Sequence, residues 1–329
     1  MKILVTGGCG YIGSHTIADL VKKGYEVVSA DNYINAGPEV MDHVEQLTGK
    51  KIQNYEVDLT DLEKTKAIFA DHPDIKGIIH FAALKYVGES TDQPLAYFKN
   101  NLNSLLNILE CQRQWNVPNL VFSSSCSVYG NPDELPVTEA TPFKNAESPY
   151  ARTKQIGEQM ITDFAAKHKD LNFILLRYFN PAGIHSSGIL KEKAKKEVET
   201  LVPIIEEVYK GKREHLTIFG GDYPTRDGTC IRDYIHIEDL AEAHTLAFEF
   251  LKKSEGGKLE IYNVGTGNGI TVLEMVKAME KVSGNKLNYS IGDKRAGDVV
   301  QVYADYSKAK NDLGWEPKLG IEDIFQSIL

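Results

Sequence analysis

Residues 2–15 read KILVTGGCGYIGSH, an apolar run that meets a glycine-rich turn and then a helical pattern. Gly7, Gly10 and Gly13 fit a GxxGxxG spacing, and the same stretch fits GxGxxG when Gly8 is taken as its start. A tight turn, a close backbone approach to a pyrophosphate and close packing of helix on strand each exclude a β-carbon. The N-terminus of the following helix favours anions. The stretch therefore predicts a dinucleotide-binding βα unit.

Asp31 and Asp58 close the next two strand-like runs of the sequence. A carboxylate at Asp31 accepts hydrogen bonds from both hydroxyls of an adenosine ribose and repels a 2′-phosphate, so NAD is favoured over NADP. A helix N-cap is the alternative role for Asp31. Asp58 either contacts the adenine or closes a turn, and the sequence leaves both interpretations open.

Short apolar runs alternate with longer amphipathic ones through the first half of the chain. The runs that predict strands are 2–6, 26–30, 52–57, 77–81, 120–123 and 172–178. The helical patterns are 14–23, 61–71, 94–115 and 148–168. Strands separated by helices of this length indicate right-handed βαβ units. We therefore expect an α/β fold with a doubly wound parallel sheet of the Rossmann type.

This alternation loosens after Asn180. The later patterns are a helix, a turn-rich loop and two strand–helix pairs, at 198–210, 220–228, 235–250 and 261–279 respectively. We expect an NAD-binding Rossmann domain at 1–180, to which the segment at about 235–265 returns. Residues 181–329 then form mainly a smaller, substrate-binding α/β domain.

Composition and charge exclude several classes of protein. A chain of 329 residues with 42% hydrophobic and 25% charged residues is typical of one large or two closely joined globular domains. Its net charge of −9 argues against nucleic acid as a partner, but not against an anionic substrate held by local arginines. The four cysteines and nine histidines show no metal or disulfide spacing. The apolar run at 3–5 is too short for a signal peptide or membrane span, so we expect a cytoplasmic protein.

The stretch SPYARTK at 148–154 carries the candidate catalytic pair. Tyr150 and Lys154 are four positions apart at the start of a predicted helix, so they share one face. A tyrosine has a pKa of about 10 and is a poor base at neutral pH. A neighbouring ammonium, helped by an oxidised nicotinamide, favours the phenolate. Upstream, the serines at 123–125 close a strand at the sheet edge where open α/β folds bind ligands.

Taken in this order, these motifs resemble the extended short-chain dehydrogenase/reductase family, and within it the nucleotide-sugar 4-epimerases. The resemblance runs nearly end to end. Besides TGGCGYIGSH and SPYARTK, it is carried by HFAALKYVGES (80–90), SSSCSVYG (123–130), LRYFNPAG (176–183), IFGGDYPTRDGTCIRDYIH (218–236), RAGD (295–298) and DYSKAKNDLGW (305–315).

The resemblance implies NAD-dependent interconversion of UDP-glucose and UDP-galactose through a 4-keto intermediate, with NAD bound throughout. It implies that Tyr150 is the base, Lys154 its electrostatic partner and ribose contact, and Ser125 a hydrogen-bond donor to the sugar O4. The implied NAD site comprises Gly7, Gly10, Tyr11, Ile12, Gly13, Asp31, Asn32, Tyr33, Asn35, Ala36, Asp58, Leu59, Phe81, Ala82, Ala83, Lys85, Asn100, Ser123, Tyr150, Lys154 and Phe179. The implied UDP-sugar site comprises Lys85, Ser125, Tyr150, Asn180, Thr200, Leu201, Thr217, Ile218, Phe219, Arg232, Arg295, Asp298 and Val302.

Three basic residues of these sets have plainer alternatives. Arg232 stands beside Asp233 and could form a surface ion pair. Arg295, in a glycine-flanked loop, could be solvated, and Lys85 could be an exposed lysine. Without the resemblance, the sequence leaves these alternatives open.

Other members of the family are dehydratases and decarboxylases. Dehydratases carry an acidic pair after the strand-end serine or threonine, whereas this chain has Cys126 and Ser127 there, which disfavours dehydration. Cys126 lacks a nearby histidine partner in sequence, so it is interpreted as a small buried residue rather than a nucleophile. His80 and His236 are interpreted as structural. A decarboxylase and a non-catalytic NAD-binding regulator remain as alternatives, although a regulator has no need of the serine–tyrosine–lysine set.

The chain departs from the common epimerase pattern in two places. Segment 184–200 lacks the usual acidic, glycine-rich stretch, and Thr200 stands where asparagine or histidine is usual. Val302 stands where a tyrosine tends to restrict N-acetylated sugars, so UDP-N-acetylhexosamines and pentose substrates remain open. Relatives form homodimers through a helix pair, and the helices at 94–115 and 148–168 either supply one or pack within the monomer.

Overall fold

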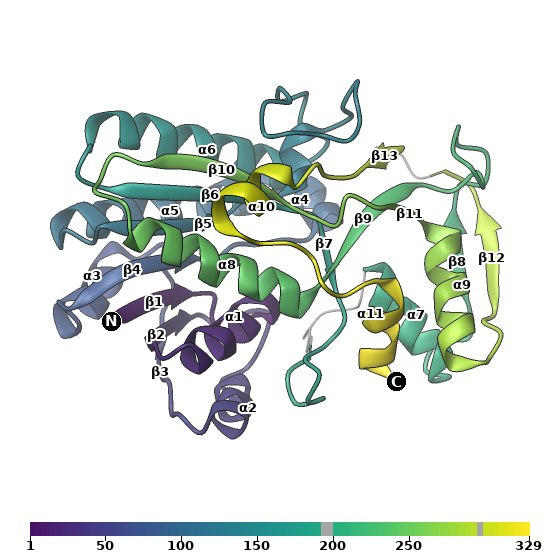
Figure 1. Cartoon of the computed structure of the whole chain (residues 1–329), viewed down its shortest axis with the longest axis horizontal. Helices are drawn as coiled ribbons and strands as arrows, with labels where there is room; N and C mark the ends of the chain where they lie inside the picture. Colours follow the sequence, from purple (N-terminus) through teal and green to yellow (C-terminus); the bar gives the residue numbers. More distant parts are fainter. Residues whose placement is uncertain (192–199, 295–298) are drawn as a thin grey trace.

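A seven-stranded parallel sheet is the centre of the larger part of the molecule (Figure 1). The computed structural model describes residues 1–191, 200–294 and 299–329. The strands, in their order across the sheet, are β10 (Leu259–Val264), β6 (Asn172–Tyr178), β5 (Asn119–Ser123), β4 (Ile75–His80), β1 (Lys2–Thr6), β2 (Glu26–Asp31) and β3 (Gln53–Glu56). The strand order reverses between β1 and β4, and ligands bind at such a switch point in open α/β sheets.

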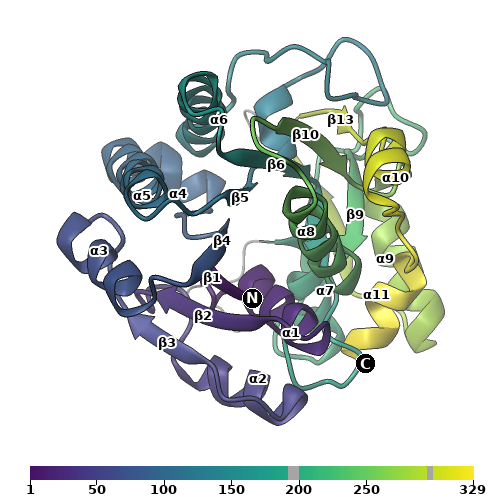
Figure 2. The same ribbon diagram turned by 60° about the vertical axis from the view of Figure 1, so that its left-hand side comes forward.

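Helices cover both faces of this sheet, so the predicted doubly wound α/β fold is confirmed (Figure 2). One face carries α1 (Tyr11–Lys22), α2 (Glu39–Thr48) and α8 (Ile237–Lys252), and the other carries α3 (Leu62–Asp71), α5 (Pro94–Gln114) and α6 (Pro149–Lys167). Alternate residues of β1 serve the two faces: Ile3 and Val5 pack on the first, and Leu4 on the second. Strands buried on both sides are typical of parallel sheets.

The smaller part of the molecule lies beyond the carboxyl ends of these strands (Figure 1). Its strands are β7 (Asn180–Ala182), β8 (Leu216–Phe219), β9 (Ile231–His236), β11 (Gly269–Thr271), β12 (Tyr289–Gly292) and β13 (Gln301–Val302). Its helices are α7 (Leu201–Tyr209), α9 (Val272–Ser283) and α11 (Ile321–Ile328), which share a core with β8 and β9. The remaining short elements are α4 (Val87–Asp92), the 3-10 turn η1 (Cys126–Tyr129) and α10 (Ser307–Leu313).

The strand–helix pair predicted at 261–279 has its helix, α9, but two strands precede that helix, and they belong to different sheets. β10 pairs with β6 in the large sheet, whereas β11 runs antiparallel to β9 in the small one. Asp233 of β9 makes the sharp crossing possible, because its carboxylate accepts the N–H groups of Thr266 (2.8 Å) and Gly267 (3.0 Å). Within the described residues, no helix is long and apolar enough to span a bilayer.

Candidate active site

The glycine-rich turn packs so closely that a side chain would collide with backbone. Gly7 has φ +69°, and a β-carbon there would lie 2.8 Å from the nitrogen of Ala82, which follows β4. A β-carbon on Gly13 would lie 2.2 Å from the carbonyl oxygen of Gly7. Helix α1 begins directly after Gly10, which caps it without any side-chain hydrogen bond. The first-turn N–H groups of an α-helix have no partner within the helix and favour an anion.

Asp31 ends β2 beside this turn. Its carboxylate accepts the N–H groups of Cys9 (3.0 Å) and Tyr33 (2.9 Å), which fixes its orientation. Burial raises the pKa of Asp31 above the ordinary value, and these backbone hydrogen bonds oppose the rise. Helix α2 has Pro38 as its N-cap, so the N-cap interpretation of Asp31 is wrong.

A cleft runs along the carboxyl edge of the sheet, from the glycine turn to the catalytic pair. The predicted NAD residues that line it are Gly7, Gly10, Tyr11, Ile12, Gly13, Asp31, Asn32, Asn35, Ala36, Asp58, Leu59, Phe81, Ala82, Ala83, Lys85, Asn100, Tyr150 and Lys154. Ile34, between the predicted Asn32 and Asn35, lines the cleft as well. The lining also includes residues that sequence reasoning missed: Cys9, Ala30, Val40, Val57, Leu84, Tyr86, Ser104, Tyr178 and Lys191. Three of the predicted NAD residues, Tyr33, Ser123 and Phe179, are not in this lining.

Several cleft residues suit a dinucleotide. The Oδ1 atom of Asn35 is buried and has no hydrogen-bond partner in the part of the chain that the structure describes, so a bound polar group could satisfy it. Asp58 both lines the cleft and closes a turn, since its Oδ1 accepts the N–H of Thr60 at 2.9 Å. Lys85 is exposed and also lines the cleft. With the glycine turn and Asp31, these groups fit NAD.

Tyr150 and Lys154 lie on the first turns of α6, whose N-cap Ser148 accepts the N–H of Ala151 at 3.1 Å. Lys154 Nζ donates to the carbonyl oxygen of Ser123 at 2.6 Å and lies 5.9 Å from the centroid of the Tyr150 ring. The N-cap of η1 is Ser125, whose hydroxyl accepts the N–H of Ser127 at 3.2 Å. The end of β5 and the start of α6 thus bring the three predicted catalytic residues together.

Burial opposes charge on both members of the catalytic pair. It lowers the pKa of Lys154 to about 8, with the charge of Glu158 acting in the other direction. It also raises the pKa of Tyr150 above its ordinary value; Tyr178 adds to the rise, and a hydrogen bond with Ser125 opposes it. The phenol is therefore protonated in the protein alone. A phenolate needs positive charge beyond that of Lys154, such as that of an oxidised nicotinamide.

Three further side chains with potentially reactive sulfur or nitrogen atoms have no catalytic role. Cys126 is half-buried, which corrects its interpretation as a buried residue. Burial still raises the pKa of its thiol to about 12, so the thiol stays protonated and is a poor nucleophile. His80 is buried, is hydrogen-bonded through Nδ1 to the Thr6 hydroxyl at 2.8 Å and has a pKa lowered to about 3 by burial. His236 caps α8 by accepting the N–H of Glu238 at 3.2 Å. No three histidine, cysteine or acidic side chains in the described ranges come together as metal ligands.

The predicted substrate residues come mostly from the smaller part of the molecule. Their positions are β7 for Asn180, the start of α7 for Thr200 and Leu201, β8 for Thr217, Ile218 and Phe219, β9 for Arg232 and β13 for Val302. Arg232 and Val302 are register partners in adjacent strands. Asp233 is buried in the turn contacts described above, so the surface ion pair with Arg232 is wrong. Arg295 and Asp298 lie outside the described residues.

Comparison with known proteins gives consistent results. A sequence model of the NAD dependent epimerase/dehydratase family matches residues 3–265. A UDP-glucose 4-epimerase of Bacillus subtilis is 47% identical over 324 residues, covering 98% of this chain and 94% of the relative. The structure of a UDP-glucose 4-epimerase from Bifidobacterium longum in complex with NAD⁺ and UDP superposes with a TM-score of 0.96 at 42% identity, covering 100% of this chain and 97% of that one. The structure of a UDP-glucose 4-epimerase from Stenotrophomonas maltophila, with bound NAD and formylated UDP-arabinopyranose, superposes with a TM-score of 0.96 at 39% identity. The match covers 100% of this chain and 96% of that one.

Proposed function

The chain belongs to the NAD dependent epimerase/dehydratase family, and from that premise we propose that it is a UDP-hexose 4-epimerase that interconverts UDP-glucose and UDP-galactose. The observation that carries the proposal is that Tyr150 and Lys154 line one end of the cleft and that Lys154 donates to the carbonyl oxygen of Ser123, at the serine-rich end of β5. Relatives named as UDP-glucose 4-epimerases, and solved with NAD, support it.

Tyr150 moves the proton in the proposed reaction. NAD, when bound, supplies the acceptor and donor of the hydride at C4. Tyr150 takes the proton from the 4-hydroxyl. It returns the proton after the 4-keto sugar has turned over in the cleft and presents its other face to the nicotinamide. Because the hydride also returns to C4, no net oxidation occurs. Ser125 holds the sugar O4, and Lys154, held by Ser123, supports the phenolate electrostatically.

The UDP group must stay anchored while the sugar turns. We assign this anchor to Asn180, Thr200, Leu201, Thr217 to Phe219, Arg232, Arg295 and Asp298. An arginine fork matches diphosphate oxygens, and Phe219, with 41% of its surface exposed, suits a uracil face. Binding energy placed on UDP leaves the sugar free to turn. In this proposal residues 1–180 and about 235–265 form the NAD-binding domain, and the rest of 181–329 binds the UDP-sugar.

The range of sugars depends on the residues beside Arg232. Val302 is buried in a cluster with Val128, Phe179 and Ala304, next to Cys126. A valine leaves more room than a tyrosine, so we extend the proposal to UDP-N-acetylhexosamines. The ratio of kcat/KM for UDP-N-acetylglucosamine to that for UDP-glucose should fall in Val302→Tyr and stay unchanged in Ile291→Tyr, an exposed position on β12.

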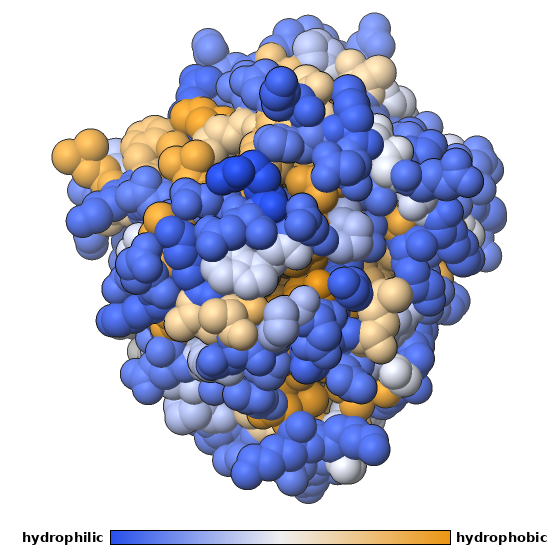
Figure 3. Space-filling view, turned by 90° about the vertical axis from the view of Figure 1, so that its left-hand side faces the viewer, coloured by the Kyte–Doolittle hydropathy of each residue, from blue (hydrophilic) through white to orange (hydrophobic). Residues whose placement is uncertain are grey.

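We also propose that the enzyme is a homodimer that works in the cytoplasm, where its four free cysteines remain thiols. Figure 3 shows apolar side chains gathered at the upper left edge, where the similar view in Figure 2 has α4, α5 and α6. Leu95 and Leu106 of α5 are 81% and 51% exposed, and Val87 of α4 is 55% exposed. An apolar surface of this kind is typical of a protein interface.

The experiment that tests the function is incubation of the purified protein with UDP-galactose, without added NAD, followed by chromatographic separation of UDP-glucose. We expect conversion, and a loss of about a hundredfold or more in Tyr150→Phe. Tyr25→Phe is the matched control, because the Tyr25 hydroxyl accepts from Lys252 at 3.0 Å, outside the cleft. Bound NAD with no turnover of any UDP-sugar would point instead to the non-catalytic regulator.

A further inference from the structure

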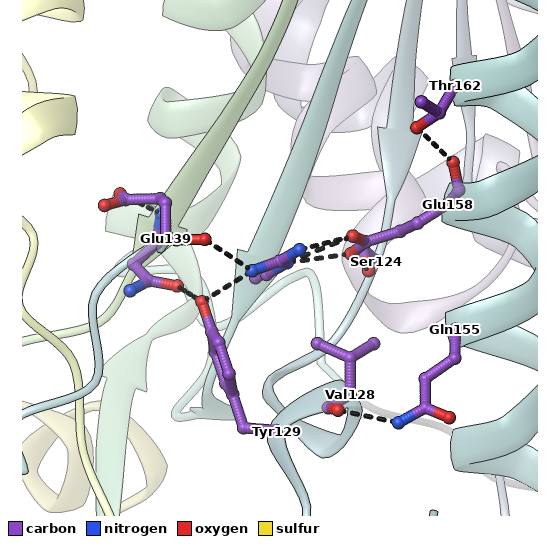
Figure 4. Close-up of polar contacts among 9 residues, drawn as sticks. Ser124, Val128, Tyr129, Glu139, Gln155, Glu158 and Thr162 are labelled. Carbon is purple, nitrogen blue, oxygen red and sulfur yellow. Dashed lines mark hydrogen bonds and ion pairs between the residues drawn. The ribbon is translucent and has the colours of Figure 1, made fainter. Parts of the chain in front are cut away.

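A buried ion pair lies one helical turn beyond the catalytic lysine (Figure 4). Glu158 follows Lys154 by four positions on α6, so the two side chains share a face. The Arg177 guanidinium of β6 holds both oxygens of this carboxylate: Nε donates to Oε1 at 3.0 Å, and Nη2 donates to Oε2 at 2.6 Å. The side chains of the pair are only 4% and 3% exposed.

The pair is connected to the end of β5 that holds the catalytic residues. Ser124 donates its hydroxyl to Glu158 Oε1, while the carbonyl oxygen of the preceding Ser123 accepts from Lys154. The Ser123 hydroxyl shares a hydrogen bond of 2.8 Å with the hydroxyl of Tyr178, which lines the cleft. Neighbouring residues of one strand end therefore fix both the lysine and the carboxylate.

Arg177 is itself held from its far side. Its Nη1 donates to the hydroxyl of Tyr129 at 3.0 Å and to the carbonyl oxygen of Glu139 at 3.2 Å. The Tyr129 hydroxyl donates in turn to Asn263 Oδ1 at 2.6 Å. With the bonds to Glu158, these contacts use four of the five N–H donors of Arg177, so the guanidinium is fixed in place against Glu158.

A contribution to the stability of the fold does not by itself explain why Glu158 and Arg177 form a buried ion pair. Removing two charges from water costs as much as their attraction returns, and apolar replacements of buried pairs are often neutral or stabilising. A carboxylate placed beside a buried ammonium has a further effect, because it favours the charged form of that ammonium.

We propose that Glu158 is a positioning residue that keeps Lys154 protonated during the reaction, and that Arg177 holds Glu158 ionised and oriented for this role. The inference rests on the proposed function and deepens it. Among the charges that act on Lys154, Glu158 is the one that opposes the lowering of its pKa by burial.

The other titratable groups near Lys154 do not supply the negative charge that stabilises its ammonium form. Burial keeps His80, on β4, neutral, since it lowers the pKa to about 3. Burial also raises the pKa of Tyr178 and of Cys126, each to about 12, so both stay protonated. Burial raises the pKa of Tyr150, and Tyr97 of α5 adds to that rise, so Tyr150 stays protonated in the protein alone.

The test is the pH profile of kcat for UDP-galactose in the wild-type holoenzyme and in Glu158→Gln. Loss of the carboxylate lets Lys154 lose its proton at lower pH, so we expect the alkaline limb to move down by about one pH unit. Glu139→Gln is the matched control, because it removes a carboxylate from the far side of Arg177, where Glu139 Oε1 accepts the N–H of Asn263 at 2.8 Å. Its alkaline limb should stay in place.

The double variant Glu158→Gln, Arg177→Met does not leave the Arg177 guanidinium buried without its carboxylate, so it serves where the single variant folds poorly. The alkaline limb of its kcat profile should also move to lower pH, but by less than in Glu158→Gln. A fall in kcat by one factor at every pH, with the limb unmoved, would overturn the inference and leave the pair a structural one. A wild-type protein without turnover would overturn the proposed function, and this inference with it.

Discussion

Lys154 carries an ammonium group in a place where burial disfavours it. Burial lowers its pKa from 10.5 to about 8. Between these values the unfolded chain binds more protons than the folded one, so the free energy of unfolding rises with pH. We predict that Lys154→Met removes up to roughly 3 kcal/mol of this rise. Thermal unfolding of both proteins on either side of this pH window measures it, and an equal pH dependence would contradict the assignment.

Asp31 should decide between the two nicotinamide dinucleotides. Asp31→Asn removes the negative charge at the end of β2, so NAD should bind about tenfold to a hundredfold more weakly. NADP should lose less affinity or gain some, because the repulsion of its 2′-phosphate is relieved. Titration with each cofactor, followed by protein fluorescence, measures both constants. Asp61→Asn is the control, since Asp61 caps α3 by accepting the N–H of Lys64; equal losses for the two cofactors in Asp31→Asn would refute the prediction.

Spacing along the chain made some of these residues predictable and hid others. Tyr150 and Lys154 could be paired from the sequence because four positions on a helix return to the same face. Glu158 stands four positions further on, so that the same rule brings it to their face. The pairing of Glu158 with Arg177 could not be inferred from the sequence, because Arg177 lies on β6, which is next to β5 only in the folded sheet.

At the scale of elements, turns were harder to predict than strands. The runs at 2–6 and 172–178 match β1 and β6 because continuous apolar residues mark strands buried on both faces. Residues 265–268, Gly-Thr-Gly-Asn, mark a turn between β10 and β11, but the change of sheet depends on the Asp233 carboxylate of a distant strand, which the local sequence does not show. Helix α2 was missed as well, although it has apolar residues at helical spacing.

Gly7, in the turn between β1 and α1, and Gly24, in the turn between α1 and β2, form a matched pair that tests whether the glycine-rich turn holds the cofactor. Gly7 and Gly24 both have positive φ, but a β-carbon on Gly24 meets nothing within 4 Å, whereas one on Gly7 meets backbone. Gly24→Ala should lose about 1 kcal/mol of stability and retain the cofactor. Gly7→Ala should lose more and release NAD, as measured by thermal unfolding and by cofactor retained through gel filtration. Retention of NAD by Gly7→Ala would show that the glycine-rich turn does not hold the cofactor.

At the scale of the whole molecule, the chain crosses between its two parts more than once. It leaves the large sheet after β6 through β7, returns to it through α8 and β10, and leaves again at β11. The cleft residues other than Lys191 lie in the large part, and most of the described substrate residues lie in the small part. An arrangement of this kind places the sugar between a cofactor and a UDP anchor.

The apolar surface on α4 and α5 predicts the state of assembly. A charge introduced at Leu95, which is 81% exposed, should dissociate a dimer formed through these helices. Sedimentation velocity should show a dimer for the wild-type protein and a monomer for Leu95→Glu. Ile291→Glu is the control, because Ile291 is 55% exposed on β12 and lies away from α5. A dimer that survives Leu95→Glu would place the interface elsewhere.

The fate of the hydrogen at C4 tests the central claim most directly. Hydride that leaves and returns within one closed site does not exchange with water, and the proton carried by Tyr150 belongs to the oxygen rather than to the carbon. The wild-type protein, given UDP-glucose deuterated at C4 in ordinary water, should yield UDP-galactose that retains the deuterium at C4, as read by mass spectrometry. UDP-galactose that has lost its deuterium to solvent would contradict epimerisation through an enclosed 4-keto intermediate.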